Sequence, residues 1–550
     1  MLIIFLLGMA LLIPCIWRET SITGQDEYWL SFRTPMETLA KDAWFTPWVN
    51  GDPRLKKPPL LYWSMILSYK TFGINLFAAR IWGVLAGAGL AVCATLLYRE
   101  LFKKSGLLAG LITLGTISVA IEGRRAMLDL PLAFFTALAV CLALRWGISG
   151  KAKWLLLAAV SLGLSFLVKG PVGIILFGVA AVGALVTYKR WPFFRDHLPH
   201  VFWGAVLVCI ISLHWPLIMA HLWPGFVQVM NSEVGARGIG TFHLGDALST
   251  LGEGLGLVFP WSLILVAALM ASGWHWKEYE RRHERWLSVW FFGCVVPFMF
   301  IHSFARYMTP LIPAAAVLCA RWLENRDDSL KHFLLCVSMG LMTLVSAAFA
   351  LFFIWFKIGV FMAFLTLLVA LLLLWMTFKK HSPRLIAGTV AILFTCIMGG
   401  LYPTLGINAM PAGIDEEIGT KPVAAFNSSQ PSMLSMRLKR SAIRIRNAVP
   451  RDMDMLTHLD GFVFVRASDT NAFEALARKL GIRFRKAGQF KTFYSRQAWI
   501  RFAREDATVR DWKTAIEQRS LQGLKATITY YRVSSAPEVS GETRSVTTER

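Results

Sequence analysis

The sequence predicts a polytopic α-helical membrane protein that ends in a small soluble α/β domain. Three observations indicate this class. Of the 550 residues, 55% are hydrophobic. Only 17% are charged, against about a quarter in soluble proteins. Long apolar runs recur along the chain, separated by short charged connections, and the mean hydropathy is +0.52. Such an apolar excess requires a lipid solvent for most of the chain.

About thirteen apolar runs are long enough to be candidate membrane-spanning helices. The first begins at Met1 and has no A-x-A-like cleavage site before the acidic loop that follows. We therefore expect a retained span, with a cleaved signal peptide as the alternative. The candidate spans are residues 1–17, 77–98, 105–121, 127–146, 153–168, 171–187, 201–221, 254–273, 286–302, 307–323, 333–355, 357–378 and 384–403.

Basic residues gather in alternate connections between these runs, as in 99–104, 145–153, 189–195 and 379–384. The positive-inside rule places such loops in the cytoplasm. We therefore expect a cytoplasmic N-terminus and an extracytoplasmic C-terminal part. The predicted domains are a transmembrane domain and a soluble tail. The transmembrane domain covers residues 1–403 and has long outer loops at 18–76 and 222–253. The soluble tail covers residues 404–550.

The soluble tail alternates strand-like and helix-like segments, which predicts a small α/β domain. The strand-like segments include 461–465 and 526–531, and the helix-like ones include 471–480. The stretch 58–72 in the first outer loop mixes aromatic residues with Lys70, and we expect it to lie along the membrane interface.

Composition and motifs exclude several function classes. The formal charge of +23 is spread along the chain between apolar runs and does not form one patch. Insertion in a membrane therefore explains the basic residues better than binding to nucleic acid does. All eight cysteines lie inside apolar runs, and their spacing is not that of a metal site. The sequence therefore indicates neither a disulfide framework nor a cysteine-based metal site. P-loop, nucleophile-elbow and HExxH signatures do not occur in a suitable context, which argues against nucleotide hydrolysis and serine-type catalysis.

Carboxylates at the outer ends of spans are the first candidates for chemistry. Asp26 and Glu27 directly follow the first span. A carboxylate at the edge of a membrane cavity can act as a general base or orient a leaving group, and the alternative is a solvated loop carboxylate. Asp129 enters an apolar helix, where an acid needs a partner. Arg124 and Arg125 lie within about two helical turns, so an ion pair with an arginine is the simplest expectation.

Several cations lie on the outer side, against the positive-inside expectation. An anionic ligand would offset them, and a phosphate or pyrophosphate head group fits because lysine and arginine bind it through charge-assisted hydrogen bonds. For each cation alone, snorkelling to the interface is the alternative. These cations are Lys56, Lys57, Lys169, Arg237 and Arg306.

Five motifs in this order resemble the polyprenyl-phosphate-dependent glycosyltransferases of the GT-C fold. The resemblance is to the branch that holds the dolichyl-phosphate-mannose-type transferases of bacteria and the aminoarabinose transferase of lipid A, and it covers the membrane portion. The motifs are the acidic pair at 26–27, Lys-Pro-Pro-Leu-Leu-Tyr-Trp at 57–63, Arg-x-Met-Leu-Asp-x-Pro-Leu at 125–132, Leu-Val-Lys-Gly-Pro at 167–171 and Arg-Tyr-Met-x-Pro-x-x-Pro at 306–313.

The resemblance implies a multi-pass enzyme of the bacterial inner membrane with a periplasmic C-terminal domain. It would move a sugar from undecaprenyl phosphate to an envelope acceptor, with lipid A or lipopolysaccharide preferred, as in polymyxin resistance. A protein acceptor, and a transporter or flippase of lipid-linked substrates, are the alternatives. Nucleic acid is not an expected partner. The implied catalytic residues are Asp26, Glu27 and Asp129. The implied substrate-binding residues are Lys56, Lys57, Arg125, Lys169, Glu233, Arg237, Arg306 and Tyr307.

The sequence departs from the family pattern in the outer loops. Trp29 and Leu30 stand where an arginine and a tyrosine are usual, which leaves the donor sugar open. Lys56 stands where a metal-binding glutamate is usual, and Val234 falls at the place of its histidine partner in a loose match of 231–234. We therefore expect no cofactor and a metal-independent site in which Lys56 supplies the positive charge, while a divalent metal stays an open alternative.

Overall fold

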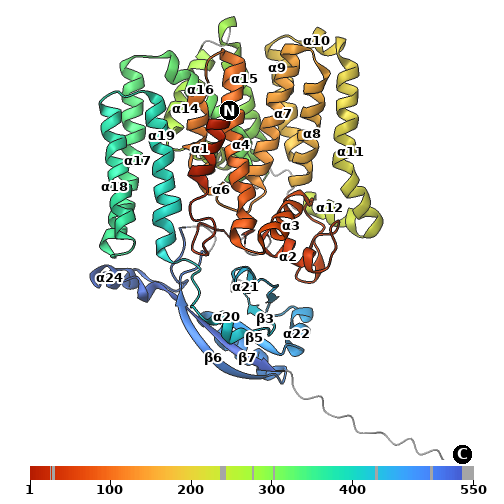
Figure 1. Ribbon diagram of the computed structural model, residues 1–550, viewed down its shortest axis with the longest axis vertical. Helices are drawn as coiled ribbons and strands as arrows, with labels where there is room; N and C mark the ends of the chain where they lie inside the picture. The colour runs from red at the N-terminus through yellow and green to blue at the C-terminus, as the bar shows by residue number, and fades with distance from the viewer. Residues whose placement is uncertain are drawn as a thin grey trace, which may run out of the picture. The chain divides into compact units, whose positions relative to one another are not determined.

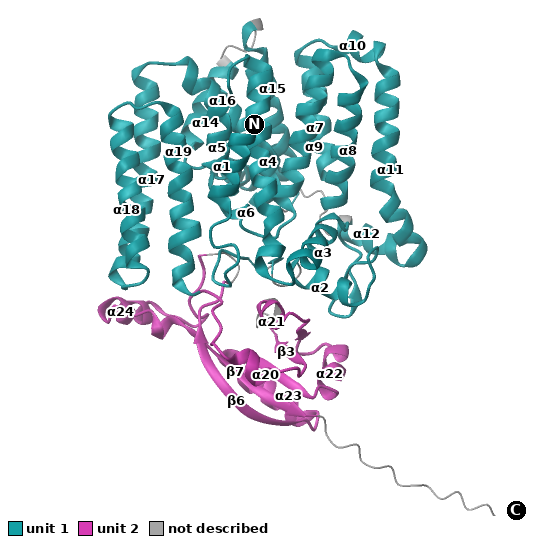
Figure 2. Ribbon diagram, viewed as in Figure 1, with its two compact units in different colours: residues 1–406 teal, residues 407–550 magenta. Residues whose placement is uncertain are grey.

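The computed structural model describes residues 1–24, 26–27, 31–235, 243–274, 278–301, 304–427, 431–495 and 500–534. The chain divides into two compact units, residues 1–406 and 407–550 (Figure 2).

The first unit is a bundle in which long helices run side by side (Figure 1). Its helices are α1 (Leu2–Leu12), α2 (Arg33–Ala40), α3 (Leu60–Phe72), α4 (Leu76–Phe102), α5 (Leu107–Leu114), α6 (Ile117–Glu122), α7 (Asp129–Ser149), α8 (Ala152–Lys169), α9 (Val172–Thr187), α10 (Trp191–Asp196), α11 (Leu198–Leu222), α12 (Phe226–Gly235), α13 (Leu244–Gly256), α14 (Ser262–Trp274), α15 (Arg282–Val295), α16 (Ile312–Asn325), α17 (Ser329–Trp355), α18 (Val360–Phe378) and α19 (Pro383–Phe394).

Seven helical segments among the described residues are long and apolar enough to cross a membrane, by length and composition. They are α4, α7, α8, α11, α17, α18 and the segment 383–405, in which a π-helix and a 3-10 turn continue α19. The predicted class of polytopic helical membrane protein is therefore confirmed. The count of about thirteen spans stays a prediction.

One predicted span, 105–121, is two helices in the structure. The helix α5 ends at Leu114, and α6 begins at Ile117. The Thr116 side chain accepts a hydrogen bond from the Val119 amide and so caps the second helix. A side-chain cap satisfies one of the amides that the first turn of a helix leaves unpaired. Apolar character alone did not reveal this break.

The first outer loop folds into α2, a two-stranded hairpin and α3. The hairpin strands are β1 (Trp48–Val49) and β2 (Asp52–Pro53). Arg33 donates to Glu37 at 3.0 Å and to the Asn50 side chain at 2.9 Å, and Glu37 accepts from the Gly51 amide. Burial lowers the pKa of the Arg33 guanidinium, and Glu37 opposes that shift. This buried pair holds the hairpin turn against α2.

The second unit is an α/β domain with a five-stranded sheet in the order β4-β3-β5-β7-β6. The first three strands in that order are parallel, and β7 pairs antiparallel with β5 and β6. The predicted strands at 461–465 and 526–531 and the predicted helix at 471–480 are present as β5, β7 and α23. The elements are α20 (Ile414–Ile418), β3 (Val423–Phe426), α21 (Pro431–Leu438), β4 (Ile443–Ile445), α22 (Pro450–Thr457), β5 (Gly461–Arg466), α23 (Thr470–Lys479), β6 (Arg483–Thr492), α24 (Val509–Glu517) and β7 (Ala526–Ser534).

Helices cover both faces of this sheet, so its central strands are buried on both sides. Val463 and Val465 point into a core shared with α22 and α23. Phe462 and Phe464 point into a second core shared with α20 and α21. Because successive side chains of a strand point to opposite faces, β5 contributes side chains to both apolar cores.

Candidate active site

Asp129 is the centre of a buried ionic network at one end of the helix bundle. It is the first residue of α7, and it pairs with Lys169, the last residue of α8. Since α7 and α8 run in opposite directions and are joined by a short turn, the start of one lies beside the end of the other. Asp129 is only 2% exposed, and an acid buried in this way requires a cationic partner.

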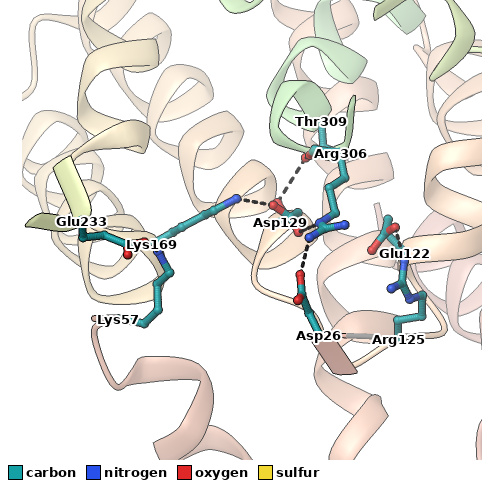
Figure 3. A network of polar contacts seen from close by, with 9 residues as sticks. All are labelled: Asp26, Lys57, Glu122, Arg125, Asp129, Lys169, Glu233, Arg306 and Thr309. Atoms are coloured by element: carbon teal, nitrogen blue, oxygen red, sulfur yellow. Dashed lines mark hydrogen bonds and ion pairs between the residues drawn. The ribbon is translucent and has the colours of Figure 1, made fainter. Parts of the chain in front are cut away.

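Arg306 joins Asp129 to Asp26. Its Nε lies 3.2 Å from one Asp129 carboxylate oxygen, and its Nη2 donates to Asp26 (Figure 3). Arg306 lies in the 3-10 helix Ala305–Leu311, where the Thr309 hydroxyl donates to the Arg306 carbonyl at 2.7 Å. The four residues Lys169, Asp129, Arg306 and Asp26 form one continuous chain of charges, here called the bridge network.

Exposure separates the two carboxylates of the bridge network. The Asp26 side chain is 47% exposed, whereas Asp129 is almost completely buried. A substrate can therefore reach Asp26, while Asp129 holds Lys169 and Arg306 in place. The structure thus brings together four of the candidate site residues, Asp26, Asp129, Lys169 and Arg306.

Aromatic rings pack on the cations of this network. The Lys169 ammonium lies 3.4 Å from the centroid of the Tyr307 ring. The Arg306 guanidinium carbon lies 4.3 Å from the centroid of the Phe304 ring. Such contacts are favourable when the cation is desolvated. Tyr307 therefore contributes an aromatic face to the network through its contact with Lys169.

A second cluster joins the two long outer loops. Lys57, just before α3, pairs with Glu233 of α12 at 2.9 Å, and Lys56 lies 3.7 Å from the other Glu233 oxygen. The Lys56 side chain is 58% exposed. Glu233 thus gathers two ammonium groups in the region where Figure 3 shows Lys57 near Lys169. The predicted site residue Arg237 lies outside the described residues.

Glu27 forms a separate buried pair, although it directly follows Asp26. Its carboxylate accepts from Arg80 at 2.9 Å and from the Ala126 amide at 2.9 Å, and both charged side chains are 0% exposed. Arg80 also donates to the carbonyls of Ile16 and Arg18. Glu27 was a catalytic candidate, but its carboxylate is enclosed, which indicates that it ties the first outer loop to α4.

Asp129 pairs with an arginine as expected, but that arginine is Arg306 and not its neighbour Arg124 or Arg125. Arg125 pairs with Glu122 at 2.6 Å and lies against Gly24, and Arg124 donates to backbone carbonyls. Both arginines precede α7, and each has one partner nearer in the chain than Asp129, Glu122 for Arg125 and the Ala120 carbonyl for Arg124. Sequence reasoning missed Glu122 and Arg80. The signal for Glu122 was its position three residues before Arg125, at the end of an apolar run.

The residues of the second cluster do not fit a metal ion. In the described ranges, no group of three or more His, Cys, Asp or Glu side chains is placed to hold one. Lys56 and Lys57 turn ammonium groups toward Glu233, and an ammonium has only donors and no lone pair to offer. Two cations on one carboxylate instead leave a net positive charge, which suits a phosphate.

A family model described as dolichyl-phosphate-mannose-protein mannosyltransferase matches residues 32–230. This range includes Lys56, Lys57, Asp129 and Lys169. An uncharacterized protein of Aquifex aeolicus is 29% identical over 65% of this chain and 70% of its own. The undecaprenyl phosphate-alpha-4-amino-4-deoxy-L-arabinose arabinosyl transferase 1 of Pseudomonas fluorescens is 25% identical over 64% of each chain. The chain therefore spans just under two thirds of that transferase.

Among solved structures, ArnT from Cupriavidus metallidurans bound to undecaprenyl phosphate superposes with a TM-score of 0.71. The match covers 96% of both chains at 17% identity. At that identity the likeness establishes the fold, and it extends over both units of this chain. Together with the motif order, the matched family model and the related transferases, it makes this chain similar in fold and sequence to ArnT-like glycosyltransferases of the GT-C fold.

Proposed function

We propose that this protein moves a sugar of the aminoarabinose type from undecaprenyl phosphate to lipid A or lipopolysaccharide at the periplasmic face of the inner membrane. The names of its relatives and the carrier bound to the structurally similar protein support this donor and acceptor. The observation that carries the proposal is the bridge network, in which Arg306 holds the accessible Asp26 beside the buried Asp129.

The reaction breaks the bond between the anomeric carbon and the carrier phosphate oxygen. The electron pair leaves with undecaprenyl phosphate, and an acceptor oxygen forms the new bond. Negative charge grows on the carrier phosphate as this happens, so cations held in a partly desolvated site lower the barrier. Lys57 and Lys56, gathered by Glu233, are the groups we assign to that phosphate.

The role of Asp26 depends on the acceptor. A lipid A phosphate is already ionised and nucleophilic near neutral pH, so Asp26 and Arg306 need only orient it. A sugar hydroxyl must lose its proton during attack, and Asp26 is the reachable base. Direct in-line attack on the carrier-linked sugar inverts the configuration of the anomeric carbon in either case.

Mass spectrometry of lipid A from the host, with and without the gene, tests this function. We expect one pentosamine increment to disappear on deletion and to return with the wild type but not with Asp26→Asn. Asp42→Asn is the matched control, because Asp42 is an exposed carboxylate of the same loop outside the bridge network. An unchanged lipid A profile under conditions of expression would contradict the lipid acceptor.

A protein acceptor is the second candidate, because the matched family model describes a protein mannosyltransferase. Glycopeptide analysis of envelope proteins from the same strains separates the two. Hexose lost from peptides with unchanged lipid A would favour the protein acceptor.

The proposed topology has the N-terminus in the cytoplasm and residues 404–550 in the periplasm. The alternation of basic connections supports it. Labelling of cysteines introduced at residues 104 and 479 with a membrane-impermeant reagent tests it. Only the second should react in intact spheroplasts.

A further inference from the structure

A large cavity lies at the end of the bundle opposite the bridge network. Its volume is about 740 Å³, and its walls come from α7, α8, α9 and α11. Asp129 begins α7, whereas the cavity is lined near the other end of that helix by Gly147 and Ile148. At 1.5 Å per residue, Ile148 lies about 28 Å from Asp129 along α7, close to the thickness of a hydrocarbon core, and Val140, the innermost lining residue of that helix, lies about 17 Å from Asp129. In Figure 1 this end carries α10, and the other carries α2 and α3.

The cavity is apolar and deep. Small side chains make its walls, among them Ala158 and Ala159 of α8 and Ala184 of α9. Along α9 the lining runs from Tyr188 to Phe177, a depth of about 16 Å. This depth is about half of a hydrocarbon core, which is the extent of one leaflet.

Cations surround the mouth of this cavity. Lys103, Arg190 and Arg282 line it together with one carboxylate, Glu100. With His283 neutral, three cations and one carboxylate give the lining a net charge of +2. Lys103 lies 3.6 Å from Glu100, so that carboxylate is already engaged. Basic pockets between membrane helices bind anionic lipid head groups.

We propose that this cavity binds an anionic glycerophospholipid of the adjoining leaflet, with its head group on Arg190 and Arg282 and an acyl chain in the apolar chamber. The depth of one leaflet matches an acyl chain, and the positive rim matches the phosphate. The carrier of the proposed donor belongs to the opposite end, where Lys57 and the bridge network lie. This lipid site is therefore distinct from the transfer site.

Lipid titration of delipidated full-length protein, read by native mass spectrometry, tests this site. We expect phosphatidylglycerol to bind more tightly than phosphatidylcholine. Arg190→Ala and Arg282→Ala should each weaken phosphatidylglycerol about five-fold, the ratio that corresponds to about 1 kcal/mol per cation. Arg195→Ala is the matched control, because this exposed cation of α10 does not line the cavity.

A cavity-filling variant tests the chamber itself. Ala184→Phe should abolish binding of phosphatidylglycerol, whereas Val182→Phe, on the exposed side of the same helix, should leave it unchanged. If Ala184→Phe fails to fold, the arginine variants still decide the question.

Three results would overturn the proposal. The first is equal binding of the two phospholipids. The second is wild-type affinity in both arginine variants, or in a folded Ala184→Phe. The third is displacement of phosphatidylglycerol by undecaprenyl phosphate in equimolar competition, which would make the carrier the occupant.

Discussion

The bridge network and the Glu27–Arg80 pair begin at neighbouring residues, yet they are built for different tasks. The bridge network ends in Asp26, which is about half exposed. The Glu27–Arg80 pair is closed on all sides and also holds the Ala126 amide. A charge that a substrate can reach can do chemistry, whereas an enclosed charge can only hold structure. This difference in exposure is the basis on which we propose a role in transfer for Asp26 and a structural role for Glu27.

Removing the closed pair is expected to have the largest effect. Glu27→Gln leaves the Arg80 charge buried without its carboxylate, which should lower the free energy of unfolding by about 3–5 kcal/mol. Thermal unfolding of the purified protein in detergent measures this loss. The double variant Glu27→Gln with Arg80→Met removes both charges and should recover part of the stability. Unchanged stability of the single variant would contradict a structural role for the pair.

Changing the accessible end of the bridge network should affect activity and not folding. Asp26→Asn removes the base or orienting carboxylate, so we expect transfer to fall about 10²–10⁴-fold. The thermal unfolding temperature should stay near that of wild type, because Asp26 is half exposed. Activity is measured with undecaprenyl-phosphate-linked sugar and lipid A. If Asp26→Asn lowered the thermal unfolding temperature together with activity, Asp26 would have a structural role like that of the Glu27–Arg80 pair.

Arg306→Lys tests whether the bridge network needs the two guanidinium nitrogens that face its two carboxylates. A lysine keeps the charge but has no planar fork to reach both carboxylates. We expect transfer to fall about 10–100-fold, as for the loss of about 1–3 kcal/mol of hydrogen bonding to a charge. Single-turnover rates with saturating donor measure this. Wild-type rates would mean that the charge alone suffices.

Lys56→Ala should have the smallest effect. Lys56 is exposed and lies 3.7 Å from Glu233, so its loss should change stability by less than about 1 kcal/mol. If Lys56 neutralises the charge that grows on the carrier phosphate, kcat should fall slightly, and KM for the donor should rise because the phosphate is already charged in the ground state. Lys57→Ala, at the closer and more buried ammonium, should lower kcat and raise the donor KM further. The reverse order would contradict the assignment of Lys57 as the principal cation.

Much of the fold was predictable because apolar runs and charge spacing report directly on membrane insertion. The segments of α4, α7, α8 and α11 are visible as apolar windows in the sequence. The break between α5 and α6 was not, because a threonine cap and one glycine leave the run apolar throughout.

The motifs named candidate residues but not the connections between them. They included Asp26, Asp129, Lys169 and Arg306, which the structure brings together, and Glu27, which it encloses in a separate pair. Sequence proximity favoured Arg125 as the partner of Asp129, whereas the antiparallel packing of α7 and α8 brings Lys169 to it. Arg80 carried no local signal at all, since its partner Glu27 is distant in the chain.

By itself the sequence determined that most of this protein lies in a lipid bilayer, the approximate positions of its helices and the residue types of its candidate site. It could do so because hydropathy and charge are local properties. Tertiary structure alone decided which carboxylate is exposed, which cation pairs with which acid and where the cavity at the α10 end opens. Those features depend on helices meeting side by side, and burial of a charge is a property of its neighbours in space.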